Sequence, residues 1–405
     1  MSDFINTIDA LGDDAVSDSL LDRTITEFAD NTLTAISDHA FRSCKQLQTI
    51  NLPIATSIGN NTFDTCISLE NVELPIVESL GNEVFKNCSS LKTINLPSIE
   101  TIGTGIFSGC SELVTVSIPN IAEIKENTFN GCTLLTGLDL STITSIGDKA
   151  FANCTSLTDE DINAPILESI GNGAFNGCGL ITTINFPTVT SISSSAESPT
   201  FGNCPLLSSI EVAAIVDLGR YAFYNCTALT SISIPHAKTV AERAFFNCKA
   251  LPLVDFPEVI SIGDYAFRYC TALTSINLPK TEIIGQGAFY NCSSLVAVKL
   301  PRVTTIASEG FYLCSSMTTI DLPVITSIAS AAFYYCRKLS AVIIRSAGVT
   351  LENSNAFSNT LIASGTGYIY APAEFIDEYK TATNWSVYSN RFRAIEDYPE
   401  ICGGV

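Results

Sequence analysis

Ser261 to Pro279 reads SIGDYAFRYCTALTSINLP, and this stretch decides the fold. Its order is Ile-Gly-x-x-Ala-Phe-x-x-Cys-x-x-Leu-x-x-Ile-x-Leu-Pro, and the same order recurs over most of the chain. Successive cysteines of the pattern are 22 residues apart, with two longer intervals of 24 and 26 residues after Cys154 and Cys178. A fixed period of this length is typical of a solenoid, in which each repeat packs on its neighbours. The pattern cysteines are Cys44, Cys66, Cys88, Cys110, Cys132, Cys154, Cys178, Cys204, Cys226, Cys248, Cys270, Cys292, Cys314 and Cys336.

Each repeat is predicted to contain one short strand. In the segment 47–53, apolar Ile50 and Leu52 alternate with polar Thr49 and Asn51, which is the two-residue period of a half-buried strand. Stacked coils would pair these strands into a parallel sheet, and the proline after each strand would end the ladder because it has no N–H to donate. The Ile-Gly pair is expected to turn the chain through the conformational freedom of glycine. The Ala-Phe-x-x-Cys segment is predicted to be one helical or 3-10 turn.

One cysteine at one phase of every coil predicts a ladder of thiols along the solenoid. Parallel Cβ directions make the near-90° disulfide dihedral difficult to form between neighbouring coils. We interpret these cysteines as buried free thiols that act as small hydrophobic side chains. A disulfide framework stays open as the alternative, and a metal site is disfavoured because His39 and His236 are the two histidines of the chain.

The repeat resembles the BspA-type (treponemal) class of leucine-rich repeats, whose consensus has the same order of residues. The resemblance implies a leucine-rich-repeat solenoid of the α/β class, with a parallel β-sheet, short helical or 3-10 turns, about 14 repeats of 22 residues and a cap at each end. Members of this class are typically surface proteins of bacteria or of mucosal protozoa that bind host or matrix proteins.

Four regions follow from this pattern. Residues 1–34 form an acidic N-terminal cap, and residues 35–345 form the regular repeats. Residues 346–396 form a degenerate last repeat and a C-terminal cap, in which Phe375, Ile376, Tyr379 and Ala382 recur at helical spacing. Residues 397–405 are expected to be a flexible tail.

Two coils are longer than the rest, at residues 158–164 and 193–200. Insertions in repeats map to loops on one face and often mark a binding region. Drift in a tolerant loop is the alternative interpretation. Asp159, Glu160 and Asp161 stand together in the first insertion but lack the spaced oxygen ligands of a calcium loop.

Composition excludes several classes of partner. The formal charge is −20 and the pI about 4.4, with 46% hydrophobic and 15% charged residues. Such a chain is not expected to bind nucleic acid or an anionic membrane surface, and it favours a cationic partner. No apolar run approaches the ~18 residues of a membrane span, so no membrane insertion is expected. The N-terminus has no basic region or apolar core of a signal peptide, so we expect a removed leader, another export route, or residence inside the cell.

No catalytic constellation is present, so an enzyme is not expected and no cofactor is predicted. The two histidines are far apart in sequence and are expected to be surface or cap-satisfied side chains. No phosphate-binding, nucleophile-elbow or zinc-protease motif occurs.

Two surfaces remain as candidate sites. The first, which we call the strand face, is the outward polar row of the strands, which is either a concave binding platform or a merely solvated sheet. The second is an aromatic stripe near the cysteine in the C-terminal half, which is either an interaction surface or internal packing. The strand-face residues are Thr49, Asn51, Asn71, Glu73, Thr93, Asn95, Thr115, Ser117, Thr183, Asn185, Ser231, Ser275 and Asn277, and the stripe is Tyr224, Phe246, Tyr265, Tyr269, Tyr290, Tyr312 and Tyr334.

The sequence therefore favours a non-enzymatic scaffold that recognises a protein or glycan ligand on an extended face. The family resemblance implies an adhesin-like protein at the cell surface or secreted. The alternative is a structural component of a larger assembly, such as a phage-borne fibre or decoration protein, with a virion-associated or cytoplasmic location. Self-association through the aromatic stripe is possible under either hypothesis.

Overall fold

The computed structural model describes residues 25–192, 194–195 and 198–402. Residues 1–24 of the predicted N-terminal cap, three positions of the second insertion and residues 403–405 of the tail lie outside the described residues. The chain divides into two compact units, which are described separately. Unit 1 comprises residues 1–189 and 197–204, and unit 2 comprises residues 190–196 and 205–405.

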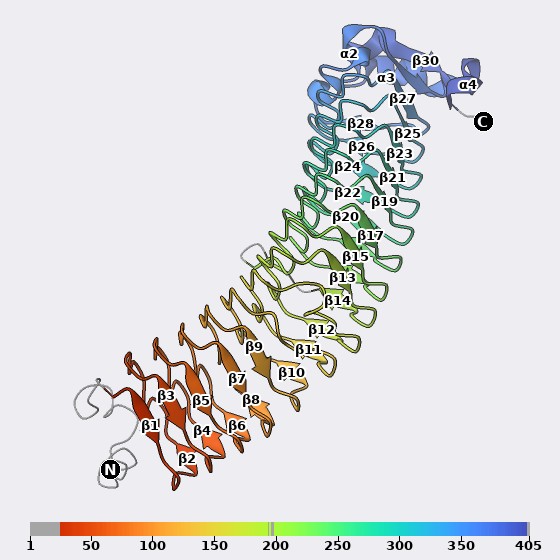
Figure 1. Cartoon of the computed structure of the whole chain (residues 1–405). Coiled ribbons are helices and arrows are strands. Elements are labelled where there is room, and N and C mark those ends of the chain that lie inside the picture. Colours follow the sequence, from red (N-terminus) through yellow and green to blue (C-terminus); the bar gives the residue numbers. More distant parts are fainter. Residues whose placement is uncertain (1–24, 193, 196–197, 403–405) are drawn as a thin grey trace. The chain divides into compact units, whose positions relative to one another are not determined.

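Unit 1 is a stack of coils, most of which have two short strands, while the coils of β11 and β12 have one (Figure 1). Strands of one ladder pair in parallel with a shift of one coil, so that Thr49 lies opposite Asn71. Strands of the other ladder pair in the same way, and Ser57 lies opposite Ser79. The three-residue strands are β1 (Glu27–Ala29), β3 (Thr49–Asn51), β5 (Asn71–Glu73), β7 (Thr93–Asn95), β9 (Thr115–Ser117) and β13 (Thr183–Asn185). The two-residue strands are β2 (Ala35–Ile36), β4 (Ser57–Ile58), β6 (Ser79–Leu80), β8 (Thr101–Ile102), β10 (Glu123–Ile124), β11 (Ser145–Ile146) and β12 (Ser169–Ile170).

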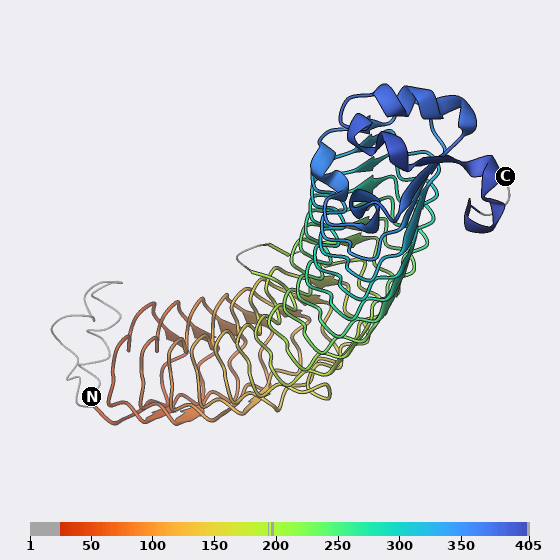
Figure 2. The same ribbon diagram turned by 90° about the horizontal axis from the view of Figure 1, so that it is seen from above.

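Unit 2 repeats this arrangement (Figure 2). Its longer strands are β15 (Ser209–Glu211), β17 (Ser231–Ser233), β19 (Leu253–Asp255), β21 (Ser275–Asn277), β23 (Ala297–Lys299), β25 (Thr319–Leu322), β27 (Ala341–Ile344), β29 (Tyr368–Ala371) and β30 (Phe392–Ala394). Its two-residue strands are β14 (Ser191–Ile192), β16 (Asp217–Leu218), β18 (Thr239–Val240), β20 (Ser261–Ile262), β22 (Ile283–Ile284), β24 (Thr305–Ile306), β26 (Ser327–Ile328) and β28 (Thr350–Leu351).

The described residues form about 17 turns of about 22 residues, more than the predicted 14. The difference arises because degenerate segments at both ends stack in register with the regular coils. Phe28 of β1 lies opposite Ile50, and Ile369 of β29 lies opposite Val342. A leucine-rich-repeat solenoid is confirmed, and its regular coils are built from strands and turns with little helix.

The Ala-Phe-x-x-Cys segment is not helical, contrary to prediction. It is a series of four-residue turns, in which Cys44 N donates to Phe41 O at 3.1 Å. Between these turns, Ser43 N donates to Asp64 O of the next coil at 2.7 Å. His39 and Ser43 have φ of 60° and 61°, and the same two positions are left-handed in most coils. All residues of a right-handed helix have negative φ, so such a helix cannot contain these two. Their N–H groups donate to the neighbouring coil instead.

The glycine of the Ile-Gly pair is required for a different reason from the one predicted. Gly147 does not have a positive φ. A Cβ at this position would lie 2.6 Å from Glu126 N in the preceding coil. The isoleucine before it belongs to the second strand ladder, which the sequence pattern did not predict. At Gly147 the pair therefore marks a close approach of two coils that leaves no room for a Cβ, whereas other coils carry Ala241 or Lys125 at this position.

The fixed letters of the repeat form the core, as predicted. Ile50 and Leu52 are fully buried. One phenylalanine per coil stacks on the next, with ring centroids 5.3–5.7 Å apart from Phe41 to Phe201 in unit 1. The corresponding spacing is 5.1–5.6 Å from Phe223 to Phe357 in unit 2. This stack runs through the interior of each unit.

The fourteen pattern cysteines are buried free thiols, as predicted. Besides packing as small hydrophobic side chains, they also form hydrogen bonds. The Cys66 thiol donates to the carbonyl oxygen of Phe41 in the preceding coil, and this contact recurs at 3.0–3.3 Å along both units. Cysteine is small enough for the close-packed interior and still supplies a weak donor. The side chain thus joins neighbouring coils.

Helices close the C-terminal end of unit 2 (Figure 2). Trp385 Nε1 donates to Val349 O at 2.7 Å and Tyr379 Oη donates to Ser346 O at 2.6 Å, so that cap side chains satisfy carbonyl groups of the last coil. Tyr398 packs against Tyr370 and Ile343 on the strand face and covers this end of it. The helical elements are η1 (Ser354–Phe357), α2 (Leu361–Ser364), η2 (Ala373–Phe375), α3 (Ile376–Thr381), η3 (Ser386–Arg391), η4 (Ile395–Asp397) and α4 (Pro399–Cys402).

We expect the fourteen ladder thiols to be unreactive toward a thiol reagent in the folded protein and reactive in guanidinium chloride. Burial raises the pKa of the Cys110 and Cys204 thiols to about 12, so the reactive thiolate is scarce at neutral pH. Counting thiols with Ellman's reagent, with and without denaturant, measures the difference. Oxidised ladder cysteines in the native protein would contradict this structure.

Replacing Gly147 by alanine should destabilise unit 1 by about 3 kcal/mol, because the added methyl group meets backbone atoms that cannot move independently. Gly179→Ala is the matched control, since a Cβ there meets no atom within 4 Å. This control should change stability by less than about 0.5 kcal/mol. Urea unfolding of both variants checks the pair, and equal losses would refute the close-approach explanation.

Candidate functional site

The strand face is exposed over most of its length. Its residues project from the three-residue strands, with apolar neighbours facing the core between them. The half-buried members are Thr49 and Asn51 on β3. The exposed members are Asn71, Glu73, Thr93, Asn95, Thr115, Ser117, Thr183 and Asn185 in unit 1, and Ser231, Ser275 and Asn277 in unit 2.

Six of the predicted residues gather around one hollow in unit 1. The hollow has a volume of about 370 Å³ and lies over β5, β7 and β9. Val72, Ile94 and Val116, the middle residues of the three strands, also line the hollow, and so does Glu70. We call it the strand-face groove, and the predicted residues in it are Asn71, Glu73, Thr93, Asn95, Thr115 and Ser117. Sequence periodicity placed these residues on one face but did not indicate a hollow.

The groove is acidic and rich in hydrogen-bonding groups. Glu70 and Glu73 are exposed, and neither carboxylate forms an ion pair with another described residue. Short hydroxyl and amide side chains of the next two coils lie beside them. Beyond β9 the ladder changes, because the bridge partner of Thr115 is Gly137, which has no side chain. The groove is thus a local feature of three coils.

The first insertion supports a strand. Asp159 Oδ1 accepts from Thr182 N at 2.6 Å and from Thr183 N at 3.0 Å, at the start of β13. In regular coils a backbone carbonyl fills this role, as when Glu70 N and Asn71 N donate to Gln48 O. Partial burial would raise the pKa of Asp159, but the hydrogen bonds from Thr182 and Thr183 outweigh it and lower that pKa. This carboxylate replaces a missing carbonyl.

The described part of the second insertion also packs inward. Ser198 and Thr200 are buried, and Phe201 stacks on Phe175 at 5.4 Å. Residues 193, 196 and 197 lie outside the described residues.

The aromatic stripe belongs to unit 2 and is half-buried throughout. Tyr290 and Tyr312 stack with centroids 4.7 Å apart, and Tyr312 and Tyr334 with centroids 5.2 Å apart. Tyr224 and Phe246 stack at 4.9 Å, and Phe246 contacts Tyr269 edge-on at 5.5 Å. The sequence-predicted stripe is therefore brought together into one surface, with Tyr265 joined to it through arginine.

Arginines are interleaved with these rings, a feature that sequence reasoning missed. The guanidinium carbon of Arg268 lies 4.4 Å from the Tyr290 centroid, 4.9 Å from that of Tyr269 and 5.3 Å from that of Tyr265. Arg243 lies 5.2 Å from the Tyr265 centroid. The sequence did contain a signal for this arrangement. Arg268 directly follows the core phenylalanine of its repeat, which is the position that Phe246 and Tyr290 occupy in theirs. We call these rings and arginines the aromatic band.

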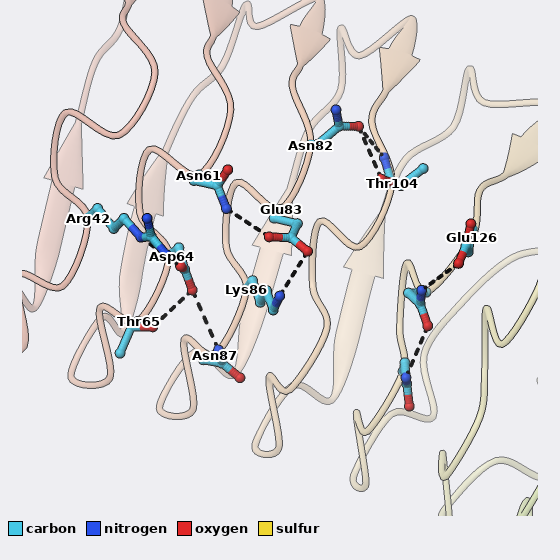
Figure 3. A network of polar contacts seen from close by, with 12 residues as sticks. Arg42, Asn61, Asp64, Thr65, Asn82, Glu83, Lys86, Asn87, Thr104 and Glu126 are labelled. Atoms are coloured by element: carbon cyan, nitrogen blue, oxygen red, sulfur yellow. Dashed lines mark hydrogen bonds and ion pairs between the residues drawn. The ribbon is translucent and has the colours of Figure 1, made fainter. Parts of the chain in front are cut away.

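The same coil positions in unit 1 carry a self-contained polar network (Figure 3). Arg42 Nε lies 3.1 Å from Asp64 Oδ2, and Lys86 Nζ lies 2.8 Å from Glu83 Oε1. Asn61 Nδ2 also donates to Glu83 at 2.8 Å. These charges are satisfied within the protein, so this face of unit 1 has fewer groups free for a ligand.

No chemistry beyond binding is indicated by the described residues. They contain no group of three His, Cys, Asp or Glu side chains placed to hold a metal ion. In the described ranges, no helix has the length and apolar character needed to cross a membrane. His236 is exposed, whereas His39 Nδ1 is buried without a hydrogen-bond partner, so the prediction of a satisfied side chain is wrong for His39.

Asp159→Ala should destabilise the protein by about 1 kcal/mol at pH 7, because two backbone N–H groups lose their acceptor. The lowered pKa means that this contribution is present above the ordinary value of 3.8 and is lost as the pH falls through the folded-state pKa. The difference between wild type and variant should therefore shrink at pH 3. Urea unfolding at both pH values measures it, with the exposed neighbour Glu160→Ala as the control. A difference that does not change with pH would contradict the assignment.

Comparison with known proteins gives consistent matches. The family model described as BspA type Leucine rich repeat region matches residues 22–136, 78–198, 144–274, 197–301 and 260–370. A leucine-rich repeat protein from Bacteroides ovatus is 25% identical, with 89% of this chain and 87% of that chain covered and a TM-score of 0.59. A leucine rich cell surface protein from Faecalibacterium prausnitzii is 24% identical, with 90% and 89% covered and a TM-score of 0.39. No curated protein matches the chain.

Proposed function

Since the chain belongs to the BspA-type leucine-rich-repeat family, we propose that it is a non-enzymatic recognition scaffold whose strand-face groove binds a protein ligand. The observation that carries the proposal is the gathering of six exposed polar side chains around one hollow over β5, β7 and β9. Extended sheet faces are the surfaces that solenoids commonly use for binding.

The chemistry of the groove favours one kind of ligand. Glu70 and Glu73 leave two carboxylates without an ion-pair partner among the described residues, and the whole chain carries a charge of −20. A lysine or arginine of a partner protein would form ion pairs with these carboxylates, whereas an acidic glycan would be repelled. Asn71, Asn95 and Thr93 supply donors and acceptors for the partner's backbone. A protein segment with basic side chains therefore fits the groove better than a glycan does.

We propose that the protein is adhesin-like and acts at the cell surface or after secretion. The family membership supports this location, and surface labelling of intact source cells tests it. Labelling confined to lysed cells would place the scaffold inside the cell and favour the alternative role in an assembly.

Glu73→Lys should weaken capture of matrix and mucosal proteins at least tenfold, because it reverses the charge of the groove. Glu100→Lys is the matched control, since this exposed glutamate lies in the next coil on the side of β8. Surface plasmon resonance against immobilised ligands, with a neutral and a sialylated glycan array in parallel, measures both variants. Equal binding by the two variants, or binding to glycans alone, would overturn the proposal.

A further inference from the structure

Arg268 is an arginine whose charge is left unneutralised. It stands in the aromatic band between Phe246 of the preceding coil and Tyr290 of the following coil. Its Nη2 donates to Tyr269 Oη at 3.0 Å, and its buried Nε has no hydrogen-bond partner. Within the described residues, the ion pairs of unit 2 do not include it. The buried Nε cannot reach a ligand, so the exposed part of this half-buried guanidinium is what an external acceptor would contact.

A second arginine of the band, Arg243, has its charge neutralised by a carboxylate of the same chain. Arg243 occupies a neighbouring position, and its Nη1 lies 3.3 Å from Glu242 Oε1. Arg220 pairs with the same carboxylate group. Arg220 and Arg243 therefore share one carboxylate in the coils just before Arg268. No carboxylate of the described residues lies within ion-pair distance of Arg268, and this distinguishes it from Arg220 and Arg243.

Arg337 repeats this condition at the other end of the tyrosine stack. Its guanidinium carbon lies 5.4 Å from the Tyr335 centroid, and Tyr335 contacts Tyr334 at 4.7 Å. The side chain is exposed, and no ion pair with another described residue includes it. The band thus has a cation at each end of the stack Tyr290, Tyr312 and Tyr334.

The geometry of the stack indicates the class of ligand. Both faces of the Tyr312 ring are covered, by Tyr290 at an interplanar angle of 5° and by Tyr334 at 7°. Sugars pack on open ring faces, and the central ring of the stack, Tyr312, offers none. The exposed parts are ring edges, which carry the positive end of the quadrupole. Burial also raises the pKa of Tyr290 and Tyr312, so their hydroxyl groups stay protonated as donors.

We propose that the aromatic band is a second binding surface, which takes an extended protein segment with two acidic side chains, one on Arg268 and one on Arg337. This surface is separate from the strand-face groove and goes beyond the function proposed for it. The two arginines are three coils apart, roughly 15 Å at about 4.8 Å per coil. An extended chain covers this distance in about four to five residues. Tyrosine and arginine are the residues that most often dominate protein interfaces.

The probe is an array of twelve-residue peptides that carry two glutamates separated by two to seven alanine or leucine residues. Matched peptides carry glutamine at both positions, and sialylated and sulfated oligosaccharides form a third set. Binding to the full chain is measured by isothermal titration calorimetry. We expect the glutamate peptides of matching spacing to bind at least tenfold more tightly than their glutamine counterparts.

Arg268→Tyr removes the charge and extends the tyrosine stack, so the variant should fold with an unchanged melting temperature. It should weaken peptide binding at least tenfold, and Arg337→Gln, a change at an exposed side chain, should do the same. Arg302→Tyr is the control, because this exposed arginine of unit 2 lies outside the band, and it should leave binding unchanged. The groove variant Glu73→Lys should also bind the peptides normally, which separates this proposal from the first.

Several results would overturn the inference. Equal binding of glutamate and glutamine peptides would show that charge does not matter. Preferential binding of the oligosaccharides would assign the band to acidic glycans instead. Wild-type affinity in the Arg268→Tyr and Arg337→Gln variants, or no peptide binding at about 1 mM, would remove the site.

Discussion

Backbone hydrogen bonding between residues one coil apart is the constraint on which this structure depends. Ser57 lies opposite Ser79, and Ser43 N donates to Asp64 O, so both strands and turns of each coil are joined to the next. Buried backbone groups must find partners, and here the partner is supplied by the same position of the following repeat. This requirement brings the coils so close that Gly147 has no room for a Cβ. It also stacks one phenylalanine on the next.

The same constraint separates scaffold from surface. Residues that point inward meet their own equivalents, so they are restricted to a few types that stack well, such as Phe267 and Cys270. Residues that point outward meet solvent and are free to vary. At the position after the core phenylalanine, unit 1 carries Arg42 in an ion pair, whereas unit 2 carries Tyr290 in a ring stack. One backbone therefore presents two chemically different faces.

Charge pairing determines which outward groups remain available. Lys86 and Glu83 satisfy each other, and Asp159 is used by β13. Glu73 and Arg268 have no ion-pair partner among the described residues. Arg268 is half-buried and Glu73 is exposed, and a ligand of opposite charge could pair with either one, which makes them the natural positions for a ligand.

The sequence by itself determined the solenoid, its core and the sidedness of its strands. A 22-residue period admits few other folds, and alternation in Thr49–Asn51 is a local property that needs no knowledge of neighbours. It also placed the strand-face residues and the aromatic stripe on their surfaces. Only the tertiary structure decided the second strand ladder, the left-handed turns at His39 and Ser43, the thiol contact from Cys66 to Phe41 O, and the role of Asp159. Each of these depends on atoms about 22 to 25 residues apart, and their separation is set by the spacing and offset of stacked coils. The groove over β5, β7 and β9 and the unpaired charge of Arg268 follow from the same packing, which no single repeat contains.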